Sequence, residues 1–151
     1  MKKVILATAV ASLLTSILNA KSIELKVGVG QESETQDSLV NIGYSVYLVD
    51  STVRLGIGVN GSFSEQDNPY MDGLLFLGVQ QNGMSIEAIA GGTLSSINNN
   101  DLSGTTIGGK IGYAINESHK FEAVYLSSTL EDSDQIEYKR KRTSINYIYS
   151  F

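Results

Sequence analysis

The sequence predicts an all-β protein in which eight antiparallel strands close into an up-and-down barrel. Apolar residues alternate with polar residues or glycine at a period of two from Ser22 onward, as in strands with one apolar face. Residues typical of turns interrupt this alternation at even intervals. The chain after Ser22 contains neither a run of about 18 apolar residues nor an apolar stripe with helical spacing, so we expect no helices there.

The alternation is clearest in the first three predicted strands. Their apolar faces comprise Ile23, Leu25, Val27 and Val29, then Val40, Ile42, Tyr44, Val46 and Leu48, and then Val53, Leu55, Ile57 and Val59. Five further strands carry the apolar faces Leu75/Leu77/Val79, Ile86/Ala88/Ala90, Ile107/Ile111/Tyr113/Ile115, Phe121/Ala123/Tyr125 and Thr143/Ile145/Tyr147/Tyr149/Phe151. In the fourth strand Leu74 and Phe76 fall on the face opposite Leu75, which leaves a register shift open.

The connections between these strands alternate in length. The tight ones are Val49 to Thr52, Asn82-Gly83 and Asn116 to His119, and the longer ones are Gln31 to Ser38, Glu65 to Tyr70, Ser95 to Gly104 and Glu131 to Ile136. An Asn-Gly pair is the preferred two-residue hairpin turn because both residues accept positive φ. Strands of about ten residues joined in this way are typical of a transmembrane barrel, with short turns in the periplasm and longer loops outside the cell. Closure follows because a bilayer does not tolerate a free strand edge.

The first twenty residues have the pattern of a cleaved secretory signal peptide. Lys2 and Lys3 precede an apolar and small-residue run from Val4 to Leu18, and Ala20 precedes the polar Lys21. The run is shorter than the roughly 20 residues of a transmembrane helix. We therefore expect two parts, a signal peptide at 1–20 and a barrel domain at 21–151.

Composition excludes several functions. The chain has no cysteine, so it has neither a disulfide nor a thiolate metal site. Sixteen acidic residues outnumber eleven basic ones, whereas a nucleic-acid surface needs clustered positive charge. The single histidine, His119, falls in a predicted periplasmic turn, so we expect neither a catalytic triad nor a histidine metal site. We expect no enzyme, no cofactor and no metal.

The C-terminus carries the most specific motif. Ile145, Tyr147, Tyr149 and Phe151 share one face, and Phe151 is the last residue. Here the chain resembles the small outer-membrane β-barrel families, grouped with the porin-like and opacity-type proteins, whose last strand ends in an aromatic residue. The resemblance implies a monomer in the outer membrane, in contact with lipid and lipopolysaccharide. It also implies that the barrel-assembly machinery recognises these four residues.

Six charged residues are expected to point into the barrel. They are Glu24, Lys26, Arg54, Glu87, Lys110 and Glu122. The interior of an eight-stranded barrel is just wide enough to be filled by side chains, and unpaired buried charges are costly, so these residues should form a charge network. We expect this network to plug the lumen, with glycines leaving some room for water. A gated, narrow conductance is the alternative.

Four consecutive basic residues lie near the outer end of the last strand: Lys139, Arg140, Lys141 and Arg142. Such a run suits contact with lipopolysaccharide phosphates, and a solvated strand end is the equal alternative. Within the run, the alternation of the strand places the side chains of Arg140 and Arg142 on the face that points into the barrel.

The sequence therefore predicts an integral outer-membrane barrel with a structural or surface-interaction role and a largely plugged lumen. A narrow, low-conductance pore for ions or small solutes is the second hypothesis. A soluble periplasmic ligand-binding barrel is the third, and it requires an apolar interior and a polar exterior, the inverse of the pattern in this chain.

Overall fold

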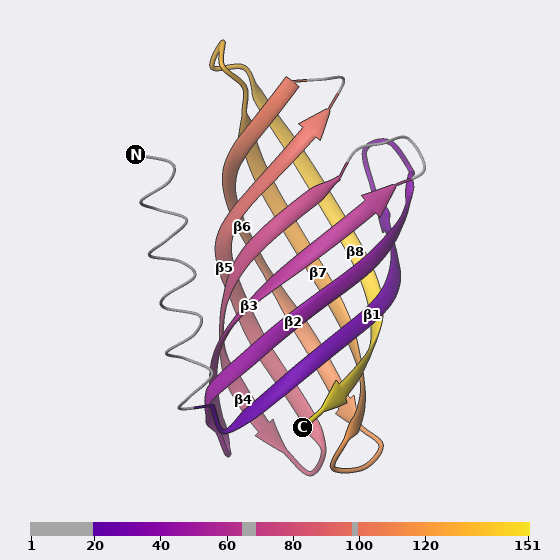
Figure 1. Ribbon diagram of the computed structural model, residues 1–151, viewed down its shortest axis with the longest axis vertical. Coiled ribbons are helices and arrows are strands. Elements are labelled where there is room, and N and C mark those ends of the chain that lie inside the picture. The colour runs from indigo at the N-terminus through magenta and orange to yellow at the C-terminus, as the bar shows by residue number, and fades with distance from the viewer. Residues whose placement is uncertain (1–19, 65–68, 98–99) are drawn as a thin grey trace.

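The computed structural model describes residues 20–64, 69–97 and 100–151, so the predicted signal peptide lies outside this part of the chain except for Ala20. Eight strands form a closed barrel in which each strand pairs antiparallel with its neighbours in sequence, and β1 pairs with β8 (Figure 1). The predicted eight-stranded antiparallel barrel is confirmed. The strands are β1 (Ser22–Glu32), β2 (Ser38–Asp50), β3 (Val53–Ser64), β4 (Tyr70–Gln81), β5 (Met84–Ile97), β6 (Asn100–Ala114), β7 (His119–Glu131) and β8 (Glu137–Ser150).

The barrel has two unlike ends. The turn end carries the β2–β3, β4–β5 and β6–β7 connections and the C-terminus, and the loop end carries the other connections (Figure 1). Asn82 and Gly83 both have positive φ, of 52° and 80°, which confirms the predicted tight hairpin turn between β4 and β5. No helix in the described part of the chain is long and apolar enough to cross a membrane.

The outward face of the barrel is apolar and the inward face is largely polar. Val29, Leu75 and Ile107 are among the exposed outward residues, at 66%, 58% and 66% exposure. Inward-facing Arg54 and Glu87 are buried, at 2% and 1%. This arrangement inverts that of a soluble barrel and is the alternation expected of strands that face lipid on one side.

The fourth strand is regular. β4 pairs with β3 and with β5 without a register shift, so Leu75 and Leu77 face outward while Leu74 and Phe76 face inward and are buried. The side chains of Leu74 and Phe76 therefore occupy an interior that the sequence pattern predicts to be polar.

One predicted loop is wrong. Ser95 to Gly104 is not a long connection, because Leu94 pairs with Ser103 and Ser95 with Leu102 in a ladder that continues to Ile97 and Asn100. The alternation persists through this segment, with Thr93 and Leu102 buried on the inward face. Serine and threonine extend β5 and β6 beyond the apolar belt as a projecting hairpin (Figure 1).

A second difference lies at the end of β2. The pairing with β3 shifts register between Tyr47 and Val49, so Leu48 is an extra residue in the strand. Such a bulge changes which side the following residues face. Val49 therefore faces outward opposite Leu55, and Asp50 pairs with Arg54, whereas the sequence predicts both Val49 and Asp50 to be in the turn.

Candidate functional site

The interior near the turn end is organised around Arg54. Its guanidinium reaches three carboxylates from three strands: Nη1 lies 2.6 Å from Glu87 Oε1, Nη2 lies 2.8 Å from Glu24 Oε1, and Nε lies 2.9 Å from Asp50 Oδ1. The guanidinium also stacks 3.7 Å from the centroid of the Tyr47 ring. Arg54 thereby ties β1, β2, β3 and β5 together across the lumen.

Lys110 on β6 extends this network one layer toward the loop end. Its Nζ donates to the Tyr47 hydroxyl at 2.7 Å, and that hydroxyl donates to Glu87 Oε2 at 2.8 Å. The same ammonium lies 3.2 Å from Glu122 Oε2 and 3.5 Å from Glu87 Oε2. All of these groups are buried, and opposite charges that share a low-dielectric interior attract strongly.

Lys26 completes the set of six predicted lumen residues. Its Nζ lies 3.7 Å from Glu122 Oε1, and its stem crosses Gly43, where an added Cβ would come within 2.7 Å of Lys26 Cγ. At Gly56 an added Cβ would meet the Tyr47 ring at 2.8 Å. These two glycines therefore provide space for neighbouring side chains, whereas we expected them to leave room for water.

The structure brings the six predicted residues together and adds three that the sequence did not single out. Lys120 Nζ lies 2.6 Å from Glu24 Oε1 at the turn end. Tyr47 links Arg54 to Lys110, and Asp50 reaches Arg54 because of the bulge. Tyr47 and Lys120 lie at alternate positions of their strands whose side chains point into the barrel. The alternation in the sequence could therefore have predicted both as interior residues.

A vestibule of about 530 Å³ opens at the turn end below this network. Its lining includes Glu24, Asp50, Arg54 and Lys120 together with the three short turns. The ion pairs of Arg54 and Lys120 with Glu24 therefore form its inner boundary.

An apolar layer lies between this network and the loop end. It consists of Tyr47, Leu74, Phe76, Ile89, Val124 and Leu126, all buried. Lys110 Nζ lies 4.3 Å from the centroid of the Phe76 ring, so Phe76 is in contact with both layers. The sequence predicted a polar lumen, and this apolar layer is a correction. Leu74 and Phe76 belong to it because the register of β4 is regular, and the other members come from β2, β5 and β7.

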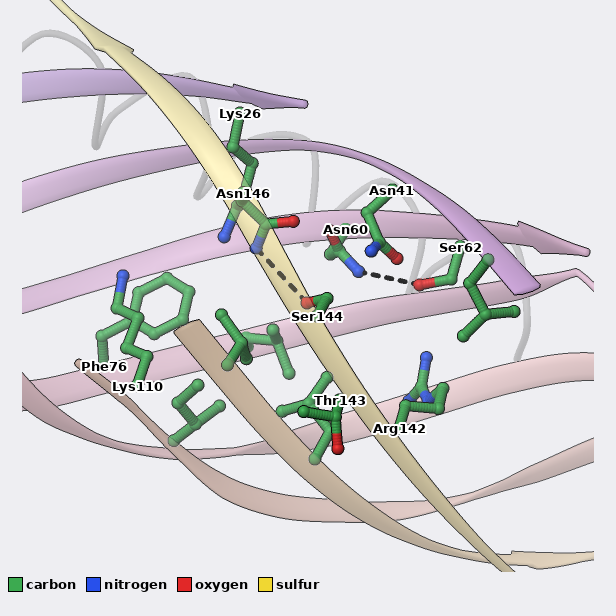
Figure 2. A pocket seen from close by; sticks show the side chains of 15 residues that line it. Lys26, Asn41, Asn60, Ser62, Phe76, Lys110, Arg142, Thr143, Ser144 and Asn146 are labelled. Carbon is green, nitrogen blue, oxygen red and sulfur yellow. Dashed lines mark hydrogen bonds between the residues drawn. The ribbon is translucent and has the colours of Figure 1, made fainter. Parts of the chain in front are cut away.

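A small cavity adjoins the apolar layer (Figure 2). It measures about 20 Å³, room for about one water molecule. Figure 2 shows polar side chains around it, with Asn60 hydrogen-bonded to Ser62 and Asn146 to Ser144. This cavity is therefore far smaller than the vestibule at the turn end.

A separate ion pair, outside the network around Arg54, lies in the half of the interior near the loop end. Asp72 on β4 accepts two hydrogen bonds from Arg142 on β8, at 2.7 and 3.0 Å. Thr93 donates to Asp72 Oδ1 at 2.6 Å, and Arg142 Nη2 donates to Ser128 at 3.0 Å. This bidentate pair joins strands that are not neighbours, and bidentate geometry adds strength to the charge interaction.

A second apolar cluster lies in the interior near the loop end. Tyr70, Leu102 and Leu130 are buried there, with Tyr138 packed against them. The Tyr70 hydroxyl donates to Glu32 Oε2 at 2.8 Å, and Arg140 Nη1 lies 3.0 Å from Glu32 Oε1.

The four basic residues of β8 therefore face opposite sides of the strand, two inward and two outward. Arg142 is buried in its pair with Asp72, and Arg140 is engaged with Glu32. Lys139 and Lys141 face outward and are exposed. Of the four residues predicted to contact lipopolysaccharide, only Lys139 and Lys141 therefore face outward, because the guanidinium groups of Arg140 and Arg142 are directed into the barrel.

The residues of the predicted C-terminal signal lie on the outward face at the turn end. Tyr149 packs edge-on against Phe151, with ring centroids 4.8 Å apart, and Phe121 contacts Tyr147 at 5.7 Å. His119 Nδ1 is hydrogen-bonded to the Tyr147 hydroxyl. Aromatic residues grouped in this way are typical of the boundary between lipid and water.

No family model matches the sequence, and no curated protein matches it. Solved structures match the fold. The N-terminal β-barrel domain of Pseudomonas aeruginosa OprF superposes with a TM-score of 0.68 at 13% identity, covering 87% of this chain and 98% of that domain. The Yersinia pestis outer membrane protein Ail gives a TM-score of 0.55 at 12% identity, covering 86% of this chain and 99% of Ail.

The outer membrane enzyme PagL also matches, with a TM-score of 0.56 at 11% identity over 83% of this chain and 98% of PagL. The chain thus has the fold of the small eight-stranded outer-membrane barrels. Since an enzyme shares this fold, the fold alone does not decide between a catalytic and a non-catalytic barrel. The narrower grouping with the opacity-type families stays a hypothesis.

Proposed function

We propose that the protein is an integral barrel of a bacterial outer membrane whose lumen is closed by its own side chains. Its role is then structural, or lies in surface contact through its loop end. The observation that supports this best is the pairing of charges inside a barrel whose outside is apolar. Arg54 bonds three carboxylates from three strands, and the apolar layer around Phe76 lies above it.

The membrane location is supported by the exposed apolar belt. A soluble protein seldom exposes a continuous apolar surface around its whole circumference. In a bilayer the same surface contacts lipid, and every backbone hydrogen-bonding group of a closed barrel is paired between strands.

Export and assembly complete the proposal. Residues 1–20 are proposed to direct the chain to the periplasm and to be removed, leaving 21–151. Ile145, Tyr147, Tyr149 and Phe151 are proposed to be recognised by the barrel-assembly machinery. We further propose that the barrel is a monomer without catalytic activity, because its one histidine is bonded to Tyr147 on the outward face at the turn end.

A narrow pore is the second candidate. The vestibule and the small cavity approach the same charged layer from opposite sides: Glu24 and Arg54 line the former, while Lys26 and Lys110 line the latter. A rearrangement of these ion pairs would connect the two spaces. The apolar contacts of Phe76 oppose such a path because they exclude water.

Cysteine labelling tests the proposed topology. The chain has no cysteine, so single cysteines at Asp134, in the β7–β8 loop, and at Asn82, in the β4–β5 turn, are unique targets. On intact cells an impermeant thiol reagent is expected to label the Asp134→Cys variant and to leave the Asn82→Cys variant unlabelled until the outer membrane is opened. Equal labelling of both variants in intact cells would rule out the proposed orientation.

A further inference from the structure

The buried charges around Arg54 form a series of ion pairs that begins and ends on a lysine. Asp50, a further carboxylate, is bonded to Arg54 and lines the vestibule, where its side chain is 18% exposed. Asp50 therefore compensates the vestibule end of the series and not the opposite end. In order, the buried members of the ion-pair series are Lys26, Glu122, Lys110, Glu87, Arg54, Glu24 and Lys120, so its four cations outnumber its three carboxylates.

Lys26 is the less satisfied of the two terminal lysines. Its Nζ lies 3.7 Å from Glu122 Oε1, beyond hydrogen-bond distance, and this is its one ion pair within the described part of the chain. Lys120 Nζ, by contrast, donates to Glu24 Oε1 at 2.6 Å. Glu122 has a closer partner than Lys26, because Lys110 Nζ lies 3.2 Å from its Oε2. The Lys26 ammonium is therefore free to contact another anion.

The small cavity in Figure 2 supplies space for such an anion. Three basic side chains line it, those of Lys26, Lys110 and Arg142, and none of its described lining residues is an aspartate or a glutamate. Two buried donors of lining residues, Asn41 Nδ2 and Arg142 Nε, have no hydrogen-bond partner among the described residues. A buried donor without a partner is costly, so we expect an acceptor in the cavity.

A small anion suits the cavity better than a water molecule does. Water accepts hydrogen bonds but carries no charge, whereas an anion is attracted by the three cations, and this attraction is strong in a low-dielectric interior. The lining also has a buried acceptor without a partner, Asn146 Oδ1, but this oxygen lies against β1, where a Cβ on Gly28 would meet it at 2.1 Å. The volume of about 20 Å³ limits the occupant to a single small ion.

We propose that the cavity binds one chloride ion, held by the Lys26 ammonium, the Asn41 amide and Arg142 Nε. The ion continues the alternation of the ion-pair series, so that its four cations face four anions. It also links β1, β2 and β8, the strands that carry these three residues. The inference goes beyond the proposed function and does not rest on it, because the site lies inside the barrel whatever surrounds the outside.

The direct test replaces chloride with bromide. The barrel is folded from urea in sodium bromide and crystallised in the same salt, and anomalous diffraction is recorded at the bromine absorption edge. Bromide gives an anomalous signal there and water gives none. We expect an anomalous peak in the cavity beside Lys26 Nζ of the wild type. A cavity that holds water alone, without an anomalous peak, would overturn the proposal.

Three variants test which groups hold the ion. Lys26→Gln removes the charge at the cavity end of the ion-pair series, and Lys120→Gln is its matched control because Lys120 lines the vestibule instead. Asn41→Leu removes a donor and leaves every ion pair in place. The bromide peak should be absent from Lys26→Gln, weaker in Asn41→Leu and unchanged in Lys120→Gln. Equal occupancy in the wild type and Lys26→Gln or, should that variant fail to fold, in the wild type and Asn41→Leu would overturn the site.

Chloride should also stabilise the folded barrel, because an ion that binds only the folded state shifts the folding equilibrium toward it. Gluconate is too large for the cavity, so potassium gluconate at the same ionic strength is the reference salt. A tenfold rise in potassium chloride should raise the folded-to-unfolded ratio of the wild type and of Lys120→Gln by up to about tenfold over the change in gluconate. Lys26→Gln should lack this gain.

The stability measurement also separates this inference from the proposed function. Equal responses of the wild type and Lys26→Gln to the two salts would overturn the chloride site and leave the proposed function intact. Failure of the wild type to insert into lipid vesicles would overturn the proposed function and leave the chloride site standing.

Discussion

Replacing Arg54 with alanine is expected to lower the free energy of unfolding of the barrel by about 3–5 kcal/mol. The substitution removes one guanidinium and leaves the carboxylates of Glu24, Glu87 and Asp50 without their shared partner. Glu24 retains Lys120 and Glu87 retains Lys110, which places the expected loss toward the lower part of that range. Urea titration of the barrel folded into lipid vesicles measures the loss.

Two further variants separate charge loss from other effects of the substitution. Lys139→Ala breaks an exposed ion pair with Glu137 and should cost less than about 1 kcal/mol. Glu87→Gln introduced together with Arg54→Ala should recover part of the stability, because it removes one of the carboxylates left without a partner. An Arg54→Ala barrel as stable as the Lys139→Ala barrel would show that the buried network does not hold the strands together.

Replacing Phe76 with alanine is expected to cost about 3–5 kcal/mol and to let ions pass through the barrel. The Phe76 ring lies in the apolar layer, 6.1 Å from the Tyr47 ring centroid and 4.3 Å from Lys110 Nζ. Its removal enlarges the small cavity that it lines and brings water to the charged layer. The expected readouts are a lower urea midpoint and current steps in a planar bilayer.

Leu77→Ala is the matched control for Phe76→Ala. Leu77 lies on the same strand, faces outward and is 59% exposed, so its truncation leaves no internal cavity. We expect a smaller loss of stability and no current steps from this variant. Equal losses of stability for the two variants, with no current from either, would mean that the apolar layer does not close the lumen.

Strand parity was enough to predict the barrel and the six central charges. Glu24, Lys26, Arg54, Glu87, Lys110 and Glu122 lie opposite the apolar face of their strands, so their direction follows from the period of two alone. The face of a strand on which a side chain lies is a local property. The sequence therefore predicts it wherever the alternation is unbroken.

The partners of these charges are not a local property. Arg142 and Asp72 are 70 positions apart, and they meet because of the stagger between strands around the barrel. The alternation placed Arg140 and Arg142 inward on β8, but it did not identify Glu32 and Asp72 as their partners. The bulge at Leu48, which brings Asp50 to Arg54, likewise has no proline or glycine to mark it in the sequence.

The conductance of the wild-type barrel tests the proposed closed lumen most directly. The folded protein, with insertion verified by protection of its strands from protease, is placed in a planar bilayer in potassium chloride, and single-channel current is recorded beside the Phe76→Ala variant. Paired charges and the apolar layer predict a flat baseline for the wild type and discrete steps for Phe76→Ala. Frequent, long-lived current steps from the wild type would contradict the closed lumen and favour the narrow pore.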